Sequence, residues 1–441
     1  MMKRRNFLQL MVGAGLTTGM PGLLNQAKAA TVEIEPYSGD FYVLIDAEGG
    51  WDVTSLCDPK QSTSINNWAI NDTTKSITGS PIEYAPFAHN ERFFNQHVND
   101  MLVVNGIDAQ TNAHQAGRRH NWSGRLAEGY PSFAALVAAI KAPQLPLAYI
   151  SNGSYNHTAE LLTYTLMQDP SALNKLVYQD RFLDYDPATW DAPQYYHRKN
   201  TRDLIAEQQA LRLERLKAKQ GLASRLEKSI SQFANAKNGQ PLLDRLAANI
   251  PTTLVDYRDS DGEWNPLLRQ AQIALAAYKS GLCVSCDLLS WGFDTHSNHD
   301  VDHATSIRRL QNGIEFLWAE AERQGIADKV KVLISSDFGR TPEYNDGSGK
   351  DHWPIGSAIF MQKNAPWGNR VVGKTNASHE ALKINPVSLQ QDESDSGIII
   401  QPKDIQQGMR ELAGIDQHPL SLQFPLDAQT IDLFNTSTST L

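Results

Sequence analysis

Short apolar runs without polar alternation recur along the chain, and each is followed by a polar or ionisable loop. They cover residues 41–45, 101–104, 147–150, 282–290 and 331–336. Strands with this pattern are buried on both faces, as in a parallel sheet covered by helices. An amphipathic helix that stops at Gly325 separates the last two runs, which makes them a parallel strand–helix–strand unit. The pattern therefore predicts an α/β fold with a mostly parallel central sheet flanked by helices.

A different pattern fills the middle of the chain. Between residues 198 and 236, Lys, Arg, Glu, Gln, Ala and Leu dominate, and leucines recur at helical spacing. We expect residues 155–250 to form a helical insertion or cap within a single domain that spans residues 30–441. Its alternating charges are typical of a solvated helix face rather than of a binding surface.

The overall charge narrows the range of partners. The 441-residue chain carries 40 basic and 49 acidic residues, a net charge of −9. Nucleic-acid binding needs a basic face, so no nucleic acid is expected as a partner. No apolar run after the first 29 residues is long enough to cross a bilayer, so no stable membrane span is expected. An anionic substrate would need a local cation or a metal.

The first 29 residues have the features of an export signal. A basic start with Arg4 and Arg5 precedes an apolar stretch, and Ala27-Lys28-Ala29 supplies a small-x-small cleavage site. The paired arginines favour a twin-arginine signal over an ordinary secretory signal, which stays the alternative. We therefore expect a periplasmic or secreted protein that is exported by the twin-arginine pathway.

Four of the predicted strands are followed by residues that could bind a metal or take part in catalysis. The candidates after the successive strands are Asp46 and Asp52; Thr111 and His114; Asp294, His296 and His299; and Asp337 with Asp351 and His352. In a parallel sheet these strand ends lie along one edge, where α/β proteins bind ligands. Carboxylates with neutral imidazoles suit zinc, whereas oxygen-rich sites suit magnesium, manganese or calcium. Spacing alone does not choose between Asp46 and Asp52, or between His296 and His299.

Four short motifs give the chain a family resemblance: Gly49-Gly50-Trp51-Asp52, Gly292-Phe293-Asp294-Thr295-His296, Ser336-Asp337-Phe338-Gly339-Arg340 and Gly349-Lys350-Asp351-His352. They resemble the exported domain-of-unknown-function fifteen-hundred-and-one family, which is similar in fold to the alkaline phosphatase and sulfatase superfamily. The resemblance implies an alkaline phosphatase-like fold. It also implies metal ligands at Asp52 (or Asp46), Asp294, His296 or His299, Asp337 and His352.

The resemblance also has two departures. Phe338 stands where phosphatases carry the second residue of an Asp-His ligand pair. No serine or cysteine marks the nucleophile position, so Thr111 and His114 are the catalytic candidates, and Arg340 is a candidate anion clamp. One metal, or none, fits this pattern better than two.

These expectations lead to two functional hypotheses. The first is an exported, metal-dependent hydrolase that acts on a small phosphate or sulfate ester. The second is a non-catalytic periplasmic binding or assembly protein that retains the fold, because fold does not fix function.

Overall fold

The computed structural model describes residues 35–167, 195–219, 221–238, 240–251 and 254–434, so the predicted export signal lies outside the described residues. The chain divides into two compact units. One comprises Met1–Glu35 and Ser171–Asp244, and the other comprises Pro36–Pro170 and Arg245–Leu441. The insertion predicted at 155–250 overlaps the first unit, and its boundaries stay a prediction.

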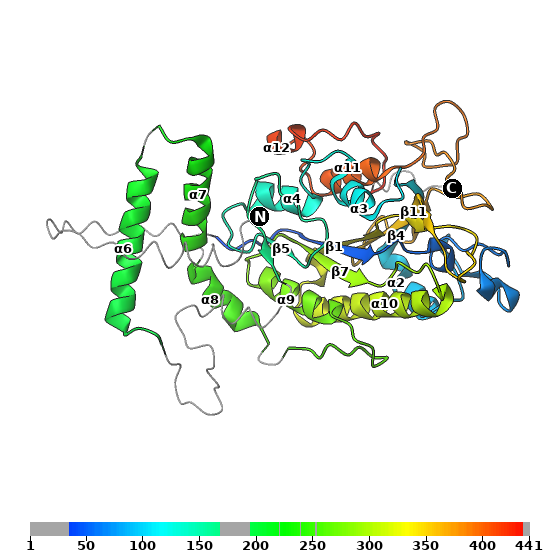
Figure 1. The fold of residues 1–441 in the computed structure, drawn as a ribbon, viewed down its shortest axis with the longest axis horizontal. Helices are drawn as coiled ribbons and strands as arrows, with labels where there is room; N and C mark the ends of the chain where they lie inside the picture. The colour runs from blue at the N-terminus through cyan, green and yellow to red at the C-terminus, as the bar shows by residue number, and fades with distance from the viewer. Residues whose placement is uncertain (1–34, 168–194, 220, 239, 252–253, 435–441) are drawn as a thin grey trace. The chain divides into compact units, whose positions relative to one another are not determined.

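The larger unit is built on an eight-stranded sheet with the order β12-β4-β11-β8-β1-β7-β5-β6 (Figure 1). All its strands run parallel except β11, which is antiparallel to both β4 and β8. The mostly parallel sheet predicted from the apolar runs is confirmed. The strands are β1 (Phe41–Glu48), β4 (Met101–Asp108), β5 (Tyr149–Ser151), β6 (Thr165–Leu166), β7 (Ser285–Trp291), β8 (Val330–Ser336), β11 (Ile355–Met361) and β12 (Arg370–Val372).

Helices cover both faces of this sheet. In Figure 1, α3 (His114–Ser123), α4 (Phe133–Lys141) and α11 (Pro402–Leu412) lie above it, and α9 (Leu267–Lys279) and α10 (His299–Arg323) lie below. The Ser132 hydroxyl caps α4 by accepting from the amide of Ala135, at 3.2 Å. The smaller elements are α2 (Asn90–His97), α12 (Pro419–Leu422) and the two-stranded pairs β2 (Lys75–Ser76) with β3 (Glu83–Tyr84) and β9 (Gly339–Arg340) with β10 (His352–Trp353).

The centre of the sheet joins strands that are distant in sequence. β1 lies between β7 and β8 and is parallel to both, with Ile45 beside Leu288 on one side and Ile334 on the other. All three residues are fully or almost fully buried, as their unbroken apolar runs predicted. The carboxyl ends of β1, β4, β7 and β8 consequently point to the same edge.

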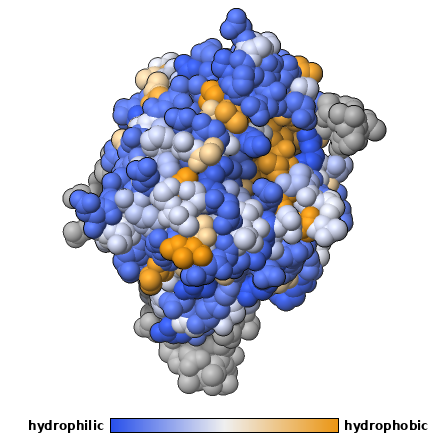
Figure 2. All heavy atoms as spheres, turned by 90° about the vertical axis from the view of Figure 1, so that its right-hand side faces the viewer, coloured by the Kyte–Doolittle hydropathy of each residue, from blue (hydrophilic) through white to orange (hydrophobic). Residues whose placement is uncertain are grey.

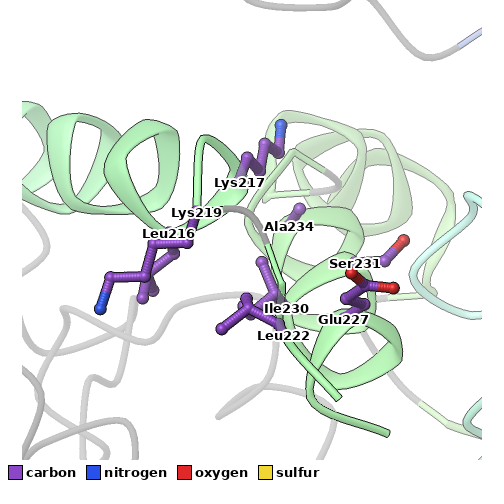
Figure 3. Close-up of a pocket in the computed structure, with 8 residues that line it drawn as sticks. All are labelled: Leu216, Lys217, Lys219, Leu222, Glu227, Ile230, Ser231 and Ala234. Atoms are coloured by element: carbon purple, nitrogen blue, oxygen red, sulfur yellow. The ribbon is translucent and has the colours of Figure 1, made fainter. Parts of the chain in front are cut away.

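The smaller unit contains α6 (Lys199–Lys217) and α7 (Ser224–Asn238), and α8 (Gln240–Asn249) continues from it into the larger one. A small core of Leu213, Ile230 and Ala234 joins α6 to α7. Beside it lies a cavity of about 430 Å³ that includes Leu222 and Lys217 in its lining (Figure 3). This unit therefore has an apolar cluster of its own.

The face of the molecule shown in Figure 2 is mainly polar. On the face shown in Figure 2, hydrophilic residues dominate and apolar ones form small, separated patches. Among the described residues, no helix combines the length and apolar character that spanning a membrane would require.

Candidate metal centre

The site begins with a tight contact between the loops that follow β1 and β7. Gly49 has a φ of +121°, and a Cβ there would lie 2.4 Å from the amide nitrogen of Asp294. Only glycine allows this approach, because it has no Cβ and tolerates positive φ. The turn after β1 thus fixes the backbone position of Asp294.

Four side chains converge at this edge: His114 from the start of α3, Asp294 and His296 from the loop after β7, and His352 from the start of β10. One ligand atom each from His114, Asp294 and His352 lies within 4.8 Å of the others. The Nε2 atom of His296 lies 3.0 Å from Nε2 of His352 and 3.1 Å from Oδ1 of Asp294. Asp294 also lies 3.3 Å from Nε2 of His352 and, through Oδ2, 3.5 Å from Nε2 of His114. These four residues form the ligand cluster.

Each imidazole in the ligand cluster is oriented by a hydrogen bond from its other nitrogen. The Nδ1 atoms of His114, His296 and His352 bond, respectively, to Asp337 at 2.7 Å, to Asp351 at 2.7 Å and to the carbonyl of Asn112 at 2.8 Å. Because these oxygens can only accept, each Nδ1 carries the proton. The three Nε2 atoms are then left with lone pairs, and those of His296 and His352 lie 3.0 Å apart. Outer hydrogen bonds of this kind are typical of metal-binding histidines.

The spacing of the ligand cluster fits a metal ion. Ligand atoms about 2.0 Å from a tetrahedral zinc lie roughly 3.3 Å from one another, and the contacts to Asp294 and between His296 and His352 span 3.0–3.5 Å. Two imidazole lone pairs at 3.0 Å repel each other unless a proton or a cation lies between them. Nitrogen and carboxylate donors together suit zinc better than magnesium or calcium.

The protonation states also suit a metal. Burial lowers the pKa of His352, and the nearby charge of Arg340 lowers it further, so the imidazole is neutral at pH 7. For Asp294, burial raises the pKa, but the hydrogen bond and charge of Arg340 outweigh burial, and the net pKa is lowered. A neutral imidazole and an ionised carboxylate are the forms that bind metals.

The ligand cluster is open to solvent on one side. The side chains of His114, Asp294, His296 and His352 are 32, 50, 46 and 22 % exposed. Structural zinc sites are closed by four protein ligands, whereas catalytic sites leave a position for water or substrate. The exposure here resembles the second kind.

Three predicted ligands, Asp52, His299 and Asp337, lie outside the ligand cluster, and the first two pair with each other. Both are fully buried, and Oδ2 of Asp52 accepts from Nε2 of His299 at 3.0 Å and from Nζ of Lys350 at 2.8 Å. The other oxygen accepts from the amide of Thr54 at 2.9 Å, which caps the short helix Val53–Ser55. Burial raises the pKa of Asp52, but Lys350, His299 and His303 together outweigh burial, so the pKa is well below its usual range. Both oxygens of Asp52 therefore accept hydrogen bonds, and its carboxylate forms a buried ion pair with Lys350.

Asp337 orients one member of the ligand cluster, since its Oδ2 accepts a hydrogen bond from Nδ1 of His114. Its Oδ1 lies 3.5 Å from Nε of Arg118. Arg118 also contacts Asp46 at 3.5 Å and Glu48 at 2.7 Å. Burial and the charge of Asp337 raise the pKa of Asp46 to about 8, and its Oδ1 has no hydrogen-bond partner among the described residues. The surroundings of Asp46 thus favour its protonated form more than those of an exposed carboxyl would.

The predicted catalytic residues have different surroundings from those expected. His114 contributes to the ligand cluster, while Arg340 is fully buried and donates to Asp294 and to the carbonyls of Gly49, Gly50 and Lys350. Its guanidinium thus holds the loops together instead of facing a substrate. The Thr111 hydroxyl is exposed and accepts from the amide of Ala113 at 3.2 Å.

The chain is similar, at low sequence identity, to several solved structures. They include an alkaline phosphatase from the Antarctic bacterium TAB5, with 10% identity, a TM-score of 0.32 and coverage of 76% of this chain and 95% of that one. The lipoteichoic acid synthase LtaP from Listeria monocytogenes has 8% identity, a TM-score of 0.35 and coverage of 86% and 73%. A 2-O GAG sulfatase has 9% identity, a TM-score of 0.34 and coverage of 87% and 72%.

No curated protein sequence matches the chain. A family model does match it over residues 41–391, a range that contains the whole ligand cluster and the residues that orient it. The resemblance carried by the four motifs is thereby confirmed. The chain belongs to the family described as Protein of unknown function (DUF1501).

Proposed function

We propose that the ligand cluster binds one divalent transition metal, zinc by its donor chemistry, and that the protein hydrolyses a phosphate or sulfate ester there. The observation that carries the proposal is the orientation of His114, His296 and His352. Each is held by its Nδ1–H so that its free Nε2 lone pair meets the carboxylate of Asp294. The exposed side of the ligand cluster leaves room for an ester oxygen.

A bound metal would polarise the ester oxygen and lower the pKa of a water molecule. The protein's own residues prepare that chemistry. Arg340 fixes Asp294, while Asp337 and Asp351 fix two of the imidazoles. We take water as the nucleophile, because a bound metal would lower its pKa, whereas no base among the described residues contacts the Thr111 hydroxyl.

We also propose that the protein acts outside the cytoplasm. The basic start, apolar stretch and small-residue site of residues 1–29 support export by the twin-arginine pathway to the periplasm or beyond. That pathway carries folded proteins, so the metal would be loaded before export.

The first test is metal content with and without the ligands. We expect about one zinc per chain in the wild type by elemental analysis, and none in Asp294→Ala or His352→Ala. Hydrolysis across a panel of phosphate and sulfate esters should fall by about 10³-fold or more in both variants, because ligand loss removes the metal's contribution. The exposed His157, which bonds the carbonyl of Tyr130, supplies a matched control as His157→Ala. Full activity in both ligand variants would place the chemistry elsewhere.

One observation favours the non-catalytic alternative. The ring of Phe338 is buried and packs against the rings of His114 and His352, with centroids 4.9 and 4.5 Å away. This position therefore offers no second metal ligand, and a two-metal mechanism loses support. A protein that binds zinc but hydrolyses no ester in the panel would support a binding role instead.

A further inference from the structure

A closed ring of hydrogen bonds joins Asp52, His303, Thr295 and His299, close in sequence to two members of the ligand cluster. The amide of Asp52 donates to Nε2 of His303 at 2.9 Å, and Nδ1 of His303 lies 3.3 Å from the hydroxyl of Thr295. The same hydroxyl lies 2.7 Å from Nδ1 of His299, whose Nε2 meets the carboxylate of Asp52 at 3.0 Å. All four residues are buried, with at most 6 % of each exposed.

The two ends of this ring determine where its protons lie. His303 accepts from a backbone amide, so its proton is on Nδ1 and is donated to Thr295. His299 donates Nε2–H to a carboxylate, so its Nδ1 accepts the hydroxyl proton of Thr295. The Thr295 hydroxyl is therefore the one group that both accepts from His303 and donates to His299, and with one proton on each imidazole every bond in the ring is satisfied.

Thr295 lies in sequence between the ligands Asp294 and His296. Its carbonyl accepts from the amide of Lys350 at 3.1 Å, and Lys350 immediately precedes Asp351 and His352. The ammonium of Lys350 in turn reaches Asp52, at 2.8 Å. One threonine thus connects the loop after β7 to α10, to the turn after β1 and to the chain segment that carries His352.

We propose that the Thr295 hydroxyl is a positioning group for the metal. By holding the backbone between Asp294 and His296 in place, this hydroxyl sets the affinity of the ligand cluster for the metal. This inference rests on the proposed function. Removing groups that orient metal ligands typically costs about 10–100-fold in affinity. Thr295→Val keeps the shape of the side chain but removes the bonds to both histidines and the longer contact, of 3.4 Å, to the carbonyl of Phe293, whereas Thr295→Ser keeps the hydroxyl.

The test measures zinc affinity by competition with a chromogenic chelator, and the visible spectrum of the cobalt-loaded protein as a readout of coordination. We expect Thr295→Val to bind zinc about 10–100-fold more weakly and to change the cobalt spectrum, while Thr295→Ser keeps wild-type values. Ser285→Ala is the matched control. It also removes a buried hydroxyl bond, of 2.7 Å to the carbonyl of Ala134, but at the opposite end of β7.

The outcomes separate the two proposals. Unchanged affinity and spectrum in Thr295→Val, with zinc bound by the wild type, would overturn the positioning role and leave the proposed function standing. Equal losses in Thr295→Val and Ser285→Ala would also overturn it, because general destabilisation would then explain both. A wild type that binds no metal would overturn both proposals.

Discussion

At the scale of single residues, His97 has an unusual environment for an ionisable group. It ends α2 with 1 % of its surface exposed, its ring is 5.2 Å from that of Phe93, and neither ring nitrogen has a hydrogen-bond partner among the described residues. Burial, with a smaller contribution from the charge of Lys363, lowers the pKa of His97 to about 4. The buried imidazole is therefore neutral at physiological pH.

This pKa predicts a loss of stability on acidification. As the pH falls, the imidazole of the unfolded chain is protonated first, at a pKa of about 6.5. The stability that the neutral imidazole of His97 contributes to the folded protein is therefore fully present above pH 6.5 and is lost as the pH falls towards 4. The loss amounts to about 3 kcal/mol. His97→Phe should remove this part of the pH dependence, as measured by urea unfolding between pH 7 and 4. If its slope matches that of the wild type, another group titrates there.

The sequence indicated the sheet edge at which these side chains lie, because they occur in the segments that follow β4, β7 and β8. It did not separate Asp52 from the ligands, since the partner that engages this carboxylate, Lys350, is 298 residues away. Nor did it show that His114 faces Asp294, because that depends on how α3 packs at the end of β4. Local pattern identifies the sheet edge, and only tertiary contacts decide where each side chain points.

At the scale of elements, the turn after β1 limits how the site can vary. Gly49→Ala should displace the Asp294 backbone, since the new Cβ would lie 2.4 Å from its nitrogen and the positive φ adds strain. We expect weaker zinc binding and a loss of roughly 1–3 kcal/mol in the free energy of unfolding.

Gly79 provides the control for this substitution. It also has a positive φ, of +79°, but a Cβ there meets nothing within 4 Å. Gly79→Ala should therefore show the backbone strain without the change in zinc affinity. Equal zinc affinity in Gly49→Ala and the wild type would contradict the role assigned to this turn.

The elements themselves were largely predictable. The apolar runs predicted β1, β4, β5, β7 and β8 because each fills the interior of a sheet covered on both faces. The direction of β11 was not predictable in the same way. Its run Ile355–Met361 is as apolar and buried as the others, but it enters the sheet directly after the β9–β10 pair and so runs against its neighbours.

At the scale of the whole molecule, the ligand cluster belongs to one compact unit. Its four side chains and the residues that orient them all lie within Pro36–Pro170 and Arg245–Leu441. Replacing residues 171–244 by a flexible Gly/Ser linker should therefore keep the zinc affinity of the full chain, as measured by chelator competition on the purified variant. A folded deletion variant with zinc binding lost would show that the smaller unit contributes to the site.

The place of β1 in the sheet also governs when the protein can fold. This central strand is synthesised well before its two neighbours, β7 and β8, which are formed by residues 285–291 and 330–336. Pairing of such distant segments makes folding slow and leaves apolar strands exposed meanwhile. During synthesis, β1 therefore has no partner strand until residues 285–336 have been made, and β1 is the segment that a chaperone would have to protect.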